Sequence, residues 1–157
     1  MNRFTTTTLH CTLTILFLLT VATGCGRKAD PRPPEAFVPA PVRFLSAMGT
    51  VDAVTVSWFA PEKDASGEPI ESLNGFRVEK AAVDAGEVQD FENVAEIPLD
   101  SETIDPGRTY SYHDTAVRPG RTYEYAIIPI SAEGDAGMVG NRIRVTFVGQ
   151  SSVVELR

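Results

Sequence analysis

Apolar and polar residues alternate over short stretches of the chain from residue 41 onward. In residues 53–58, AVTVSW, apolar side chains occupy every second position and end at Trp58. Successive side chains of a β-strand point to opposite faces, so a period of two predicts a half-buried strand. Similar stretches, separated by turn residues, occur at residues 75–80, 94–97, 110–117, 118–130 and 141–148. No part of this region has apolar residues at helical spacing, so the pattern predicts an all-β sandwich.

A different pattern precedes this region. Residues 13–22, LTILFLLTVA, form an uncharged apolar run, and Arg3 is the one positive charge before it. The run is shorter than the roughly 20 residues that a transmembrane helix needs. Its length and its basic flank are typical of a secretory signal, so we expect a signal peptide over residues 1–24.

The signal ends at a cysteine. The segment VATGC, Val21 to Cys25, resembles the lipobox of bacterial lipoproteins, although that family more often has leucine where Ala22 stands. The resemblance implies cleavage before Cys25, a diacylglyceryl group on its sulfur and acylation of the new amino group. Two or more acyl chains hold a protein stably on a membrane, whereas one does not. The alternative is cleavage by an ordinary signal peptidase, which would release an unanchored protein.

A proline-rich segment follows the cysteine. Five prolines lie between Pro31 and Pro41, and they favour an extended linker at ~3.1 Å per residue. Residues 25–40 are therefore expected to form the lipidated cysteine and a linker that reaches up to roughly 45 Å. By the same resemblance, Gly26 in place of aspartate implies the periplasmic face of the outer membrane rather than the inner membrane.

The order of motifs after the linker resembles a fibronectin type III domain over residues 41–149. The motifs are Val54-x-Val56-x-Trp58-x-x-Pro61, Gly75-Phe76-x-Val78 and Val117-x-Pro119-Gly120-x-x-Tyr123-x-Tyr125. The resemblance implies a single seven-stranded Greek-key β-sandwich, followed by a C-terminal tail at residues 150–157. It also implies that the Tyr123 hydroxyl hydrogen-bonds to the preceding turn, where Val117 replaces the usual leucine. The expected core residues are Val56, Trp58, Phe76, Val78, Tyr123 and Tyr125.

Pro129 departs from this pattern. It lies in a segment that the resemblance places in a doubly paired strand, and proline cannot donate a ladder hydrogen bond. We therefore expect a bulge or an early end to pairing at this residue.

The net charge of the chain and the binding motifs that it lacks exclude some classes of function. The chain has 157 residues, a formal net charge of −7 and a sequence pI of about 4.8. An acidic domain repels phosphate backbones, which argues against nucleic acid as a partner. The chain contains no phosphate-binding glycine motif, and we expect no cofactor.

Catalytic groups are scarce in the sequence. His113 is the one histidine after the signal, and Asp114 follows it directly. Adjacent strand residues face opposite sides of a sheet, so the two cannot form the acid–base pair of a triad. Cys11 lies in the signal and Cys25 is expected to carry lipid, which excludes zinc ligation by cysteine and histidine. We expect no catalytic and no metal-binding residues, and hence no enzyme.

Calcium binding is the alternative interpretation of two acidic segments. The carboxylates are Asp84, Glu87, Asp90 and Glu92 in the first segment, and Asp100, Glu102 and Asp105 in the second. Their spacing lacks the EF-hand pattern and its central glycine, so solvated loops are the expectation.

These features favour a membrane-anchored envelope lipoprotein whose sandwich binds another envelope protein or a glycan, or acts as a spacer. The alternative is a structural subunit of an envelope or secretion assembly, and a small hydrolase dependent on His113 is a third. Fold alone does not specify a ligand. We expect contacts through exposed sheet edges or through the long loop Pro61 to Asn74, with Lys63, Asp64, Glu68 and Glu71 as candidate binding residues.

Overall fold

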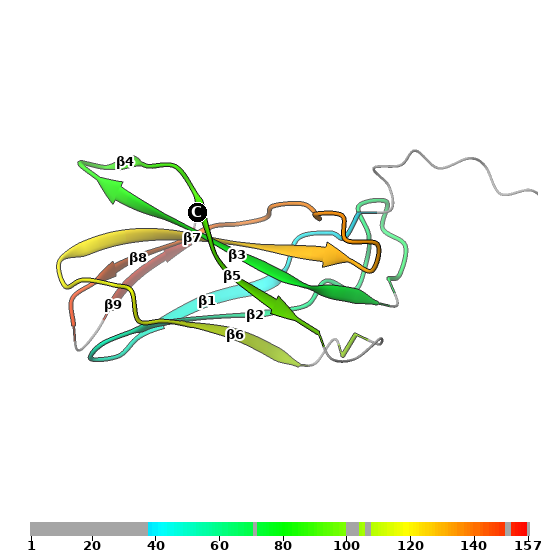
Figure 1. The fold of residues 1–157 in the computed structure, drawn as a ribbon, viewed down its shortest axis with the longest axis horizontal. Helices are drawn as coiled ribbons and strands as arrows, with labels where there is room; N and C mark the ends of the chain where they lie inside the picture. The colour runs from blue at the N-terminus through cyan, green and yellow to red at the C-terminus, as the bar shows by residue number, and fades with distance from the viewer. Residues whose placement is uncertain (1–37, 71, 100–103, 106–107, 150–151, 157) are drawn as a thin grey trace, which may run out of the picture. The chain divides into compact units, whose positions relative to one another are not determined.

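Two β-sheets make up the part of the chain that the computed structural model describes, which comprises residues 38–70, 72–99, 104–105, 108–149 and 152–156 (Figure 1). The signal and the lipobox, including Cys25, lie outside this part. No helix within the described ranges is long and apolar enough to cross a membrane.

The first sheet has three strands in the order β1-β2-β6. These strands are β1 (Arg43–Gly49), β2 (Val54–Phe59) and β6 (Thr109–Asp114). All pairs are antiparallel, with Val54 of β2 opposite Gly49 of β1 and Asp114 of β6. The alternation in β2 buries Val54, Val56 and Trp58 and leaves the residues between them on the outer face.

The second sheet has six strands, and its centre is the long pair formed by β3 (Leu73–Asp84) and β7 (Arg121–Ser131). Its order is β4-β3-β7-β8-β9, and β5 also pairs with β3. The remaining strands are β4 (Glu87–Val88), β5 (Glu92–Pro98), β8 (Ile143–Phe147) and β9 (Ser152–Leu156). The two sheets lie face to face as layers, so the chain forms the expected sandwich (Figure 1).

The core lies between the two sheets. Trp58 of β2 packs edge-on against Phe76 of β3, with ring centroids 5.4 Å apart, and Phe76 in turn contacts Tyr110 of β6. The six residues expected in the core, Val56, Trp58, Phe76, Val78, Tyr123 and Tyr125, are all buried. Burial of these large side chains provides the main driving force for folding, at about 25 cal/mol per Å² of apolar surface.

The described strands include two more than the seven of the expected sandwich. β4 is a two-residue strand in a tight hairpin with β3, which turns at Ala85 and Gly86, both with positive φ. β9 falls within residues 150–157, where we expected a tail, and it pairs antiparallel with all five residues of β8. A strand at this place satisfies the outer backbone groups of β8, which a free tail would leave exposed.

The boundary expected between linker and domain at residue 41 also moves. Pro39 is fully buried, its carbonyl accepts a hydrogen bond from the Met138 amide (2.9 Å), and it forms a β-bridge with Asp64. The last residues of the expected linker, from Val38 onward, are therefore part of the domain.

Strand pairing ends at different residues on the two sides of β7. β7 pairs with β8 from Arg121 as far as Tyr125, whereas its pairing with β3 continues past Pro129 to Ser131. The Pro129 carbonyl instead accepts a hydrogen bond from the Gly137 amide at 2.7 Å. The expected end of pairing therefore does not occur at Pro129: the pairing with β8 stops four residues earlier, and the register shift nearest to Pro129 lies between Leu73 and Gly75 of β3, opposite Ser131 and Ile130.

Candidate functional site

The loop between β2 and β3 is organised by one of its own candidate binding residues. Asp64 is 6% exposed, and its Oδ1 accepts hydrogen bonds from the Ser66 amide (2.9 Å), the Ser66 hydroxyl (2.6 Å) and the Glu68 amide (3.0 Å). An aspartate that bonds to its own following backbone in this way holds a turn. Asp64 therefore shapes the loop and does not present its carboxylate at the loop surface.

The other candidate loop residues differ in position. Lys63 and Glu68 are exposed, whereas Glu71 lies outside the described residues. The loop backbone is held by the segment before β1, because the Ala40 amide donates to the Lys63 carbonyl (3.0 Å) and the Ala65 amide donates to the Val38 carbonyl (2.9 Å). Lys63 and Glu68 thus lie on an anchored loop, from which a fixed surface can be presented to a partner.

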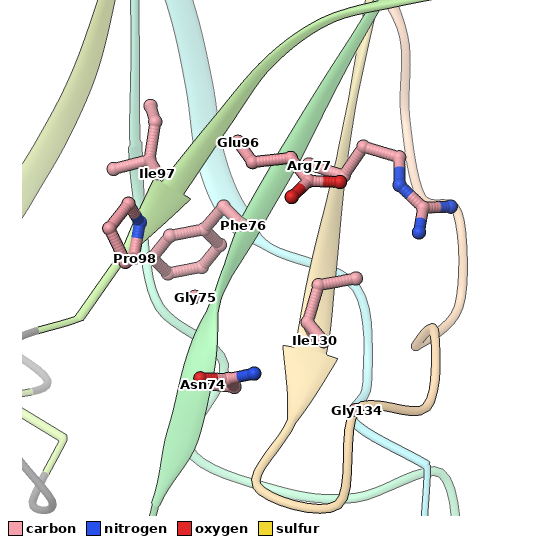
Figure 2. Close-up of a pocket in the computed structure, with 9 residues that line it drawn as sticks. All are labelled: Asn74, Gly75, Phe76, Arg77, Glu96, Ile97, Pro98, Ile130 and Gly134. Atoms are coloured by element: carbon pink, nitrogen blue, oxygen red, sulfur yellow. The ribbon is translucent and has the colours of Figure 1, made fainter.

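A shallow pocket of about 340 Å³ lies where β3, β5 and the end of β7 meet (Figure 2). Its lining includes the Arg77 and Asn74 side chains of β3, Glu96 and Pro98 of β5, and Ile130 of β7. Arg77 is half-buried, and Figure 2 shows its guanidinium extending across β7. Arginine and asparagine offer hydrogen-bond donors, which suit a carboxylate or a hydroxyl-rich ligand.

A second pocket of about 410 Å³ lies at the opposite end of the same sheet. It is lined by Val83, Ala85, Gly86, Thr122, Arg144, Thr146 and Glu155. The Thr122 and Thr146 hydroxyls hydrogen-bond to each other at 3.0 Å, which leaves few uncommitted polar groups in it.

A buried ionic cluster joins the two sheets. The Lys80 ammonium of β3 lies 2.6 Å from the Asp114 carboxylate of β6, and the Tyr125 hydroxyl of β7 donates to the same carboxylate at 2.8 Å. The other carboxylate oxygen accepts the Ala116 amide (2.8 Å), and Lys80 also donates to the Ala116 carbonyl (2.7 Å). Asp114 is 1% exposed, so no ligand can reach it and the cluster is structural.

The same cluster raises the pKa of two phenol groups. Burial, together with the hydrogen bond to Asp114, raises the pKa of Tyr125 far above its ordinary value. Burial and the nearby Asp114 charge also raise the pKa of Tyr112. Both groups therefore stay neutral over the pH range in which proteins function.

His113 and Asp114 point to opposite faces of β6. His113 is exposed, and its Nδ1 lies 3.0 Å from the Thr55 hydroxyl, whereas Asp114 is buried in the ionic cluster. The structure does not bring the two side chains together into an acid–base pair. Within the described residues, no three His, Cys, Asp or Glu side chains are grouped so that they could hold a metal ion.

The outer face of the second sheet has a further ion cluster. Glu124 of β7 is 4% exposed although it points away from the core, and its carboxylate accepts two hydrogen bonds from the Arg144 guanidinium (2.9 and 3.1 Å). Arg142 approaches the same carboxylate at 3.8 Å and lies over the Phe91 ring at 4.4 Å. A two-pronged arginine–carboxylate contact fixes both side chains and stabilises this face.

The outer face of the first sheet is different, because its outward-facing residues include no Asp, Glu or Lys and only one Arg. They are Arg43, Phe44, Ser46 and Met48 on β1, Thr55, Ser57 and Phe59 on β2, and Thr109, Ser111 and His113 on β6. Phe44 is 74% exposed, has a positive φ of 52° and touches the Phe59 ring edge-on. A bulky residue in this backbone conformation is strained, and such strain is concentrated at functional sites.

Comparison with known proteins bears on the fold. No protein-family model matches the sequence, and no curated protein matches it. Among solved structures, the chain is similar to the twitchin kinase region from C. elegans (21% identity, TM-score 0.52), with 71% of this chain and 17% of that chain covered. It is also similar to a solution structure of a human fourth FNIII domain (17% identity, TM-score 0.51), with 81% of this chain and 92% of that chain covered.

These similarities establish the fold class, which is the two-sheet β-sandwich of fibronectin type III domains. The fold includes the tyrosine contact that the sequence motif implied, because the Arg118 amide donates to the Tyr123 hydroxyl at 3.1 Å. Fold class by itself leaves the ligand unspecified.

Lys80 and Glu124 are not among the residues that the sequence pattern singles out, and Asp114 enters that pattern only as the neighbour of His113. Asp114 has the same strand parity as Tyr110, which is buried, so the alternation in residues 110–114 could have placed it in the interior. No comparable signal exists for Glu124, because its burial depends on arginines that come from the next strand.

Proposed function

We propose that this chain is an envelope lipoprotein, anchored through Cys25, whose fibronectin type III-like sandwich is a non-catalytic module that binds a protein or a glycan or serves as a spacer. The observation that carries the proposal is the motif VATGC directly after an apolar signal and before a folded β-sandwich. The sandwich begins by Val38, so the 12 residues 26–37 connect it to the cysteine. An extended chain of that length reaches roughly 37 Å.

Replacement of the anchoring sulfur tests the proposal. We expect Cys25→Ser to move the protein from the membrane fraction to the soluble fraction, or to stop its processing, because the acyl chains provide the membrane affinity. Cys11→Ser is the matched control, since the residue lies in the signal and should leave the distribution unchanged.

The intact mass of the mature wild-type chain provides the second measurement. A chain that begins at Cys25 and carries diacylglyceryl and acyl groups supports the anchor. A processed chain with an unmodified N-terminus, or a processed Cys25→Ser chain that stays on the membrane, would overturn it. Separation of the two membranes by density then tests the proposed location on the periplasmic face of the outer membrane.

A structural subunit of an envelope or secretion assembly is the second candidate. The outer face of the first sheet favours it, because Arg43 is its one charged residue and charged residues are depleted at the centres of protein interfaces. Size-exclusion analysis of the detergent-solubilised protein separates the two functions. A subunit elutes in one large complex of constant composition, whereas an independent module or spacer elutes mostly alone.

A further inference from the structure

The border strands of the two sheets differ in how they are protected against pairing with another chain. Edge strands present unpaired backbone groups, and proteins usually protect them with bulges, charged side chains or proline. β1 has an irregular register between Arg43 and Ser46, where Phe44 has a positive φ. β5 pairs with β3 through a register shift, carries Glu92 and Glu96, and ends at Pro98.

β6 has none of these devices. All six of its residues pair with β2 without a register shift, and it contains neither proline nor glycine. Its one carboxylate, Asp114, is neutralised by Lys80 in the interior. Within the described residues, no backbone hydrogen bond reaches the other side of β6, which borders the first sheet (Figure 1).

We propose that β6 pairs with β6 of a second copy of this chain, antiparallel, with Ser111 opposite Ser111. Residues that lie opposite each other in an antiparallel pair have their side chains on the same face of the sheet. The two-fold axis that relates the two copies must therefore pass between a residue and the same residue of the second copy, so that each residue's opposite number is an even number of positions away in the sequence. With the axis at Ser111, Thr109 faces His113 of the second copy on the outer side. On the inner side, Tyr110 faces Tyr112, which is a favourable aromatic cross-strand pair.

The tyrosines select this register over its neighbour. With the axis at Ser111, Tyr110 of each copy is opposite Tyr112 of the other, so two aromatic pairs form. With the axis at Tyr112, a single Tyr112–Tyr112 pair would form, and Tyr110 would be opposite Asp114, whose side chain is buried.

Charge favours a second copy as the occupant. A chain of net charge −7 repels itself over most of its surface, but the outer face of the first sheet carries no Asp or Glu, and its one charged residue, Arg43, lies on β1 at the far side of β2 from β6. Pairing through β6 joins two such faces into one continuous sheet with no like charges opposed. Pairing of two copies through β5 would instead bring the glutamates of both copies together.

A cysteine at the two-fold axis tests the pairing. Opposed residues in an antiparallel pair have Cα atoms about 4.5–5.5 Å apart, which a disulfide can span. We expect the full-length Ser111→Cys chain, oxidised in its native cells, to run as a disulfide-linked dimer on non-reducing gels. Ser57→Cys is the matched control, because Ser57 lies beside Ser111 on the same face, where two copies would be separated by roughly 14 Å.

The wild-type chain is the second control, because any dimer formed through its native cysteines appears there too, whether or not Cys25 carries lipid. The proposal is overturned if Ser111→Cys gives no more dimer than wild type, if Ser57→Cys gives as much, or if Ser111→Cys is captured by a different protein. The register is tested by mixing Thr109→Cys and His113→Cys chains, which should form the mixed disulfide in preference to either homodimer.

A charge at the axis provides an independent test without cysteine. Ser111→Lys places two ammonium groups opposite each other and should shift the solubilised protein from dimer to monomer in light scattering, whereas Ser57→Lys should not. An unaltered dimer fraction in Ser111→Lys would exclude β6 as the interface.

Discussion

Tyr125 shows most directly how a single side chain links the interior of this protein to solvent pH. Its ring is fully buried, and its hydroxyl donates to a carboxylate that also holds Lys80. Ionisation of this phenol would place a second negative charge beside Asp114 in the interior. The raised pKa of Tyr125 is therefore a property of the folded state alone.

This shift predicts a loss of stability in alkaline solution. In the unfolded chain the phenol ionises near its ordinary pKa of 10.0, whereas the folded protein keeps the proton bound to higher pH. The folded state then holds more protons, so stability is complete below pH 10 and falls as the pH rises above it. One such group contributes a slope of at most about 1.4 kcal/mol per pH unit.

Tyr125→Phe isolates this contribution. The variant loses the hydrogen bond to Asp114, so we expect it to be less stable than wild type at pH 8, by about 1.5–3 kcal/mol. Above pH 10 its free energy of unfolding should fall less steeply than that of wild type. Urea denaturation at several pH values between 8 and 11 measures both effects, and equal slopes in the two proteins would contradict the assignment.

At the scale of elements, the segment before β1 is held between the β2–β3 loop and the turn after β7. Pro39 accepts a hydrogen bond from Met138, and Gly137 lies against both Pro39 and Pro129. A Cβ at position 137 would lie 2.8 Å from the Pro39 carbonyl oxygen and 2.9 Å from the Pro129 carbonyl oxygen. Glycine is required here because backbone, rather than a movable side chain, occupies the space.

Gly137→Ala should therefore loosen this contact. We expect a cost of about 1–3 kcal/mol, typical of overpacking in a closely packed site. Urea denaturation measures the cost, and faster hydrogen exchange at the Met138 amide would localise it. Glu133→Ala, an exposed change in the same turn, should stay within about 0.5 kcal/mol of wild type. A Gly137→Ala protein as stable as the control would mean that the segment is not held as described.

At the scale of the whole molecule, the two sheets are joined by apolar packing and by one buried ionic cluster. Lys80 comes from the second sheet and Asp114 from the first, and their side chains are 11% and 2% exposed. No disulfide is expected to support the sandwich, because both cysteines precede it in the sequence. A charge left alone at this place would be more costly than the intact pair is stabilising.

The cluster predicts strongly coupled substitutions. Asp114→Ala should cost about 3–5 kcal/mol, because it leaves the Lys80 ammonium buried without its counter-ion. The double variant with Lys80→Met should be less destabilised than Asp114→Ala alone, since no charge then remains inside. Asp84→Ala, which breaks the exposed pair with Arg121, should cost no more than about 1 kcal/mol. Additive costs in the double variant, measured by urea denaturation, would show that the two groups do not act as a pair.

The sequence was most informative where local pattern and burial coincide. Alternation in residues 53–58 and 141–148 predicted strands whose apolar side chains are buried in the structure, because one face of each strand packs on a core. Asp64 shows the limit of prediction from local pattern. An acidic residue in a polar loop is predicted to be exposed, but Asp64 is buried by the turn that it organises.

By itself, the sequence determined the two-sheet class, the core aromatics and the motif order, since side-chain period and turn chemistry are local properties of the chain. Only the tertiary structure decided that β9 extends the second sheet, that Pro39 is buried and that Lys80 meets Asp114. The same holds for β6, whose place at an unprotected edge depends on the order of strands in the sheet. These features depend on contacts between segments far apart in the chain, which no local pattern encodes.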